Sequence, residues 1–117
     1  DDNWRLALTE KGQAEILAWE LGQKFLKKPK RWDKKWRLLI FDIPETRKKS
    51  RAQLRLTLVG LGFKRLQDSV WVYPYDCEDL IALAKANLRV GADVLYMIVE
   101  RLERDKHLCE HFGLPFE

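Results

Sequence analysis

A segment of eight residues rich in apolar side chains, Trp36 to Ile43 (WRLLIFDI), constrains the fold more than any other feature of this sequence. The run is rich in large aliphatic and aromatic side chains, and its one acid is Asp42. Pro44 follows directly and cannot donate to a strand ladder. Such a segment is typical of a central strand buried within a sheet. We therefore expect a β-sheet with this strand inside it.

The segments that follow alternate between helical and β patterns. After Pro44, an amphipathic helix presents Leu54, Leu58 and Leu61 on one face and ends at Gly62. Two β-prone runs, 63–66 and 69–73, precede a second helix capped by Asp76 that ends near Gly91; 94–99 is a fourth strand. The order β-α-β-β-α-β predicts an α+β, ferredoxin-like sandwich, with helices on one face of an antiparallel sheet. The other sheet face is expected to be open.

Two further helices are expected at the ends of the chain. Thr9 is a suitable N-cap for a helix from about Glu10 to Leu26. This helix runs into the basic segment 27–31, where Pro29 and mutual charge repulsion predict a linker. A C-terminal helical extension, Arg104 to Phe112, ends at Gly113 and is expected to pack over part of the open sheet face or to reach a partner.

Positive charge is concentrated in the first half of the chain. Of the 117 residues, the segment 24–65 contains 15 basic and 3 acidic side chains, whereas the formal net charge of the whole chain is only +4. A cluster of this kind favours polyanions. Taken singly, each cation also fits a solvated helix face. The candidate nucleic-acid-binding residues are Lys34, Lys35, Arg47, Lys48, Lys49, Arg51, Arg55 and Lys64.

Several classes of protein are excluded or disfavoured by what the sequence contains. Its longest uninterrupted apolar run, Val94 to Val99, has six residues, against roughly 20 for a membrane-spanning helix, so we expect no membrane partner. Cys77 and Cys109 stand far apart, without the spacing of a disulfide framework or a zinc ribbon, and a cytoplasmic location is expected. Gly-rich phosphate loops and nucleophile elbows do not occur in the sequence.

Two motifs carry a resemblance to known families. The runs WDKKWRLLIFDIPE (32–45) and LGFKRLQDSVWVYP (61–74) resemble the central domain of PaaX-type transcriptional repressors, which is similar to CRISPR-associated protein 2. The resemblance covers residues 31 to about 103. It implies a ferredoxin-like domain over 31–117. Residues 1–30, with the motif Leu8-Thr9-Glu10-Lys11-Gly12, then resemble the end of a winged-helix region, a connecting helix and the basic linker.

The resemblance also implies a function and an alternative. The implied function is that of a homodimerising domain in a PaaX-like transcriptional regulator, and the domain associates with DNA or RNA. The open sheet face and the strand edges are expected to form the dimer surface. The alternative is a metal-dependent endonuclease or a CRISPR adaptation-complex subunit, with the CRISPR integrase subunit as a partner. In that case two copies of Asp42 share Mg²⁺ or Mn²⁺ across the dimer. The chain has Val72 where the adaptation family often has Glu, and this favours the regulator.

Asp42 is the candidate catalytic and metal-binding residue, and two interpretations of it stay open. A carboxylate at the end of a central apolar strand is costly unless it is paired, hydrogen-bonded or bound to a cation. It either faces its dimer copy around a divalent metal, or it accepts backbone N–H bonds in the turn at 43–45 and caps the following helix. Trp32, Trp36 and Trp71 are expected to serve packing rather than base stacking.

Overall fold

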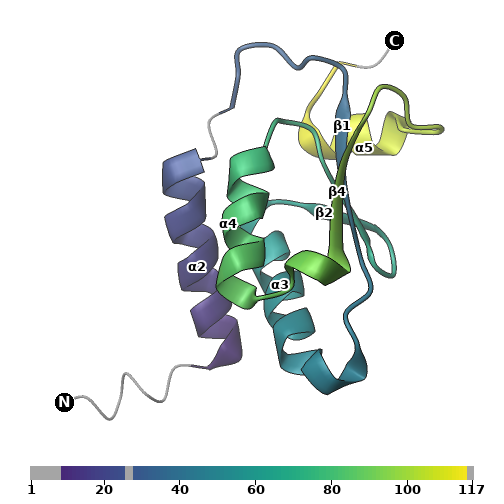
Figure 1. Cartoon of the computed structure of the whole chain (residues 1–117). Helices are drawn as coiled ribbons and strands as arrows, with labels where there is room; N and C mark the ends of the chain where they lie inside the picture. Colours follow the sequence, from purple (N-terminus) through teal and green to yellow (C-terminus); the bar gives the residue numbers. More distant parts are fainter. Residues whose placement is uncertain (1–8, 26–27, 116–117) are drawn as a thin grey trace.

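The computed structural model describes residues 9–25 and 28–115. Helix α2 (Glu10–Phe25) comes first and strand β1 (Trp36–Phe41) second. Next come the turn η1 (Glu45–Arg47), helix α3 (Lys48–Leu61) and the strands β2 (Lys64–Gln67) and β3 (Val70–Tyr73) (Figure 1). The chain continues with helix α4 (Glu78–Leu88), turn η2 (Gly91–Asp93), strand β4 (Val94–Val99) and helix α5 (Lys106–Phe112). Among the described residues, no helix is long and apolar enough to cross a membrane.

The four strands form one antiparallel sheet in the order β2-β3-β1-β4. The apolar run that contains β1 is therefore an inner strand, paired with β3 on one side and β4 on the other. The mixed α+β architecture, the four-stranded antiparallel sheet and the N-terminal helix are confirmed. Most element bounds agree with the sequence patterns; β1 is two residues shorter because Ile43, although buried, lies beyond the ladder.

The alternation of side chains along β1 divides the interior into two cores. Leu39 and Phe41 point to the layer formed by α2, α3 and α4 and belong to the larger core. Figure 1 shows these three helices together on one side of the sheet. Helix α2 packs on α3 and α4, and its Ala18 and Leu21 belong to that same core. Helix α2 thus contributes side chains to the larger hydrophobic core.

The other sheet face is half covered by α5. Leu108 and Cys109 of α5 pack against Trp36, Leu38 and Val72. The Trp36 indole Nε1 donates a 2.9 Å hydrogen bond to Asp105, next to the start of α5. The rest of this face is open: Ile40 and Leu95 are cross-strand neighbours and are 36% and 62% exposed. The C-terminal extension therefore packs over part of the face, as one of the two expectations had it.

Helix ends follow local backbone chemistry. The Thr9 hydroxyl accepts a 3.0 Å hydrogen bond from the Gly12 N–H and caps α2. Gly62 ends α3 in the left-handed conformation, at φ 93°. Helix α4 ends at Leu88, three residues before Gly91, because Arg89 adopts the left-handed conformation at φ 55° and makes the C-cap. The N-cap residue of α4 is Cys77 rather than the expected Asp76, whose carboxylate nevertheless accepts a 3.2 Å hydrogen bond from the Glu78 N–H.

A buried arginine joins the loop before β1 to the end of β3. The Arg37 side chain is 6% exposed, donates to Asp33 at 2.6 Å and 2.8 Å, and donates to the Pro74 carbonyl at 2.9 Å. The hydrogen bond from Arg37 lowers the pKa of Asp33 below its ordinary value. The buried guanidinium of Arg37 is therefore paired with the Asp33 carboxylate, which offsets the cost of removing its charge from water.

The contact between α2 and α3 depends on a glycine. A Cβ built on Gly60 would lie 2.7 Å from the Ala18 Cβ, and neither atom can rotate away. We expect Gly60→Ala to push the helices apart and to lower the free energy of unfolding by about 1–3 kcal/mol. Urea denaturation measures this change. The matched control is Gly91→Ala, where nothing lies within 4 Å; equal stability of the two variants would contradict the close approach.

Candidate nucleic-acid interface

Helix α3 presents a row of cations along one face. Lys48, Arg51 and Arg55 are separated by three and four residues, so they lie on the same side of the helix. Arg51 donates to the Ile43 carbonyl at 3.3 Å and to the Glu45 carboxylate at 3.0 Å, which fixes its position. Arg51 and Arg55 are half-buried and Lys48 is exposed. We call Lys48, Arg51 and Arg55 the α3 basic row.

The start of α3 is unusual in its electrostatics. The N-terminal end of a helix carries partial positive charge, and acidic side chains normally stabilise it. Here the first turn contains Lys48 and Lys49, no acidic residue, and no side-chain hydrogen bond to the cap. Two lysines at this end oppose the helix dipole, so helix stability does not account for them.

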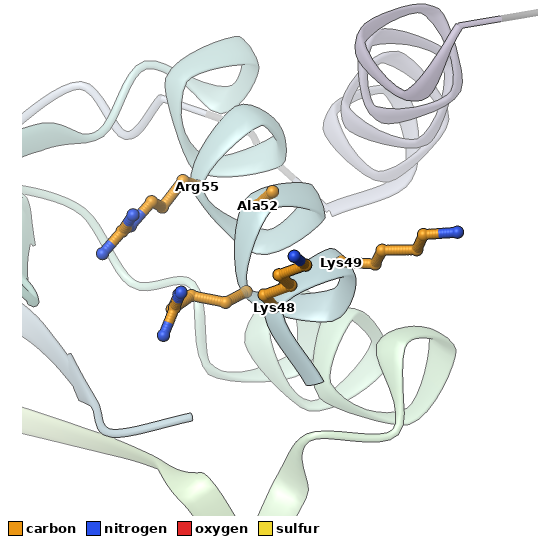
Figure 2. Close-up of a pocket in the computed structure, with 5 residues that line it drawn as sticks. Lys48, Lys49, Ala52 and Arg55 are labelled. Atoms are coloured by element: carbon orange, nitrogen blue, oxygen red, sulfur yellow. The ribbon is translucent and has the colours of Figure 1, made fainter. Parts of the chain in front are cut away.

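A shallow depression of about 390 Å³ lies along the row, lined by Lys48, Lys49, Arg51, Ala52 and Arg55. Its lining contains four cations and no carboxylate. Figure 2 shows that the Arg55 and Lys49 side chains leave α3 on opposite sides, with Ala52 between them. The small side chain of Ala52 leaves room for a ligand to approach the helix backbone. Phosphate groups are the anions that such open basic surfaces commonly hold.

The other predicted cations lie elsewhere. Lys34 and Lys35 precede β1, and Lys64 opens β2 opposite Val72, which pairs with Leu38 near the start of β1. The α3 basic row lies on the helix that follows the opposite end of β1. Turn η1 and helix α3 therefore bring together Arg47, Lys48, Lys49, Arg51 and Arg55, whereas Lys34, Lys35 and Lys64 belong to other elements.

Asp42 is exposed and directly follows β1. Its backbone N–H donates to the Asp93 carbonyl at 3.0 Å, so Asp93 lies across from it. Sequence reasoning missed Asp93, although it directly precedes the apolar run 94–99, which was expected to pair in the sheet. The alternative of Asp42 as a helix cap finds no support in the described residues: Pro44 caps η1 and Arg47 caps α3, neither with a side-chain hydrogen bond.

The acids at this corner do not by themselves fit a divalent metal. Mg²⁺ and Mn²⁺ need several oxygen ligands, and the described residues contain no group of three or more metal-ligating side chains. The Asp93 carboxylate lies 3.9 Å from the Arg47 guanidinium, which competes with a metal for it. One chain therefore offers a single uncommitted carboxylate here, and a metal would require the Asp42 of a second copy.

Burial and packing account for Cys77 and for three tryptophans, Trp32, Trp36 and Trp71. Burial raises the pKa of the Cys77 thiol to about 12, which keeps it protonated and a poor nucleophile. Trp36 and Trp71 are buried, and the Trp32 ring packs edge-on against Trp36 at 4.8 Å between centroids. The expectation that these tryptophans serve packing is confirmed: Trp36 and Trp71 belong to the two cores, and Trp32 packs against the core that contains Trp36. The basic depression on α3 is therefore the candidate site carried forward.

Comparison with known proteins gives the family. A model of the PaaX protein central Cas2-like domain matches residues 29–108, which is more than half of the chain. The chain belongs to this family. The PaaX central Cas2-like domain thus contains β1 to β4, α3, α4 and the α3 basic row, and the match ends inside α5. No curated protein and no solved structure matches the chain.

Proposed function

We propose that this PaaX central Cas2-like domain is part of a transcriptional regulator and contacts the phosphate backbone of nucleic acid through the α3 basic row. The observation that carries the proposal is the acid-free depression lined by Lys48, Lys49, Arg51, Ala52 and Arg55. Contacts of this kind position a protein on nucleic acid without reading its sequence. Sequence recognition would then belong to a winged-helix region, the end of which the motif at 8–12 resembles. Within that motif, Leu8 lies outside the described residues, and residues 10–12 form the start of α2.

The domain also serves, in this proposal, as a homodimerisation module. The strand order β2-β3-β1-β4 and the element order support classification as ferredoxin-like. Ile40 and Leu95 form an exposed apolar pair on the half of the sheet face that α5 does not cover. An uncovered apolar sheet face of this kind favours self-association, and a two-fold dimer would place the pair against its own copy.

A salt titration of nucleic-acid binding tests the phosphate contact. If the three cations of the row each neutralise one phosphate of duplex DNA, the logarithm of the affinity falls with the logarithm of salt concentration at a slope of about −2.7. Affinity then decreases roughly 40-fold between about 50 and 200 mM salt. Fluorescence anisotropy with duplexes of unrelated sequence measures the slope. A flat response would contradict the proposal.

Metal-dependent cleavage stays the alternative prediction, and it needs more than one chain. It requires two copies of Asp42 to meet across a dimer, with Mg²⁺ or Mn²⁺ between them. Exposure of Asp42 is compatible with this arrangement. The ion pair between Arg47 and Asp93 removes the nearest second carboxylate from consideration as a free ligand. The phosphate contact of the regulator proposal needs only the cations of one chain, and the regulator is therefore the conclusion.

A further inference from the structure

A second basic cleft lies where three helices meet, on a different side of α3 from the basic row. Its volume is about 480 Å³. It is lined by one residue of α2, four of η1 and α3, two of α4 and the α4 C-cap: Gln13, Arg47, Lys49, Ser50, Gln53, Asn87, Leu88 and Arg89. The two surfaces share only Lys49. The cleft thus contains three cations, four neutral polar side chains and no carboxylate.

Arg47 holds two sides of this cleft together. Its guanidinium Nη2 donates to the Leu88 carbonyl at the end of α4 at 3.2 Å, and its Nη1 lies 3.9 Å from Asp93. Because Arg47 itself is the N-cap residue of α3, this contact ties the start of α3 to the end of α4. The positive end of the α3 dipole faces the same region. The cleft is therefore electropositive and anchored by a half-buried side chain.

Arg89 supplies a cation from the opposite helix. It is exposed, and within the described segments no ion pair to it occurs. It adopts φ 55°, a conformation that costs a residue with a Cβ about 1 kcal/mol and that Gly or Asn adopts more readily. A basic residue does complement the negative end of α4. That benefit offsets the backbone cost, but it does not explain why Arg89 lines the same cleft as two other cations, Arg47 and Lys49.

We propose that this cleft binds a phosphate group, carried either by a nucleotide-sized small molecule or by nucleic acid. The volume lies within the range of small-ligand sites. Arg47, Lys49 and Arg89 provide charge-assisted donors, and Ser50 provides a hydroxyl. A ligand held there touches α2, α3 and α4 at once and links the connecting helix to the body of the domain. The inference stands apart from the proposed function because Arg89 is not in the α3 basic row.

The test compares the full chain with Arg89→Asn. The probes are inorganic phosphate, adenosine 5′-monophosphate and a short DNA duplex, each titrated by isothermal calorimetry at low salt. We expect Arg89→Asn to weaken binding of at least one probe by about tenfold, the value of one lost charge-assisted contact. Since Asn accepts the left-handed conformation, the thermal midpoint should be unchanged or raised.

A matched control and a second readout keep the test decisive. Arg101→Gln removes an exposed cation that lies beyond the other end of β4, and it should bind like the wild type. Loss confined to phosphate and the mononucleotide identifies a small-ligand site, and loss confined to the duplex identifies a backbone phosphate. Equal binding by Arg89→Asn and Arg101→Gln for every probe, or no binding of any probe, overturns the proposal. Duplex binding that survives Arg89→Asn is expected from the α3 basic row, so failure of this inference leaves the proposed function standing.

Discussion

Replacing Lys48 and Arg55 by glutamine lowers the salt slope of duplex binding by about 1.8, because each lost phosphate contact removes about 0.9 from the slope. The two residues lie on the same face of α3 and line the same depression. Arg51 is left in place, since its hydrogen bonds to Ile43 and Glu45 hold the turn before the helix. At low salt the double variant should bind at least about tenfold more weakly than the wild type, as measured by fluorescence anisotropy.

The control for this loss removes the same charge from another place. Arg101 and Lys106 are exposed, and they lie in the loop after β4 and at the start of α5. Replacing both by glutamine lowers the net charge by the same two units without touching α3. If binding depends on net charge alone, the two double variants weaken it equally and share one slope. That outcome would contradict a localised interface on α3.

Leu95→Glu should dissociate the proposed dimer into monomers. Leu95 is 62% exposed on the open half of the sheet face, opposite Ile40, so the substitution does not disturb the folded monomer. In a dimer it would bury a carboxylate against an apolar surface. We expect the dissociation constant to rise at least about 100-fold, equivalent to about 2.7 kcal/mol. Sedimentation equilibrium over a range of protein concentrations measures it.

Val59→Glu is the matched control for the dimer surface. Val59 is 59% exposed on α3, close to the exposure of Leu95, but it lies on the helix layer. The wild type and Val59→Glu should show the same dissociation constant. A dimer that is as tight in Leu95→Glu as in the wild type, or a wild type that stays monomeric at millimolar concentration, would show that the open face is not the dimer surface.

Much of the fold could be predicted because its local signals agree with one another. The apolar-rich segment 36–43 indicated an inner strand, and Gly62 marked the end of α3. The strand predicted at 94–99 has the same bounds as β4. The end of α4 was harder, because an arginine made the left-handed cap that glycine usually makes. The packing of α2 against α3 through Ala18 and Gly60 depends on backbones approaching closely, which spacing along one helix does not show.

The candidate site was only partly predictable for a similar reason. Sequence spacing placed Lys48, Arg51 and Arg55 on one helical face, since that requires only the helical repeat. It grouped Lys34, Lys35 and Lys64 with them, because a charge count does not distinguish cations on one helix from cations on other elements. Asp93 and Arg89 reach their places through strand pairing and through the meeting of helices distant in sequence. Such proximity follows from tertiary structure, and no local motif marks it.

The measurement that tests the central claim most directly is chemical-shift mapping of isotope-labelled protein during titration with a short DNA duplex. It reports every backbone amide at once and needs no substitution that could change the fold. The account predicts that the largest changes fall on residues 47–55, around the α3 basic row, and that they diminish as salt is added. Changes confined to the open sheet face, or none at saturating duplex, would contradict it.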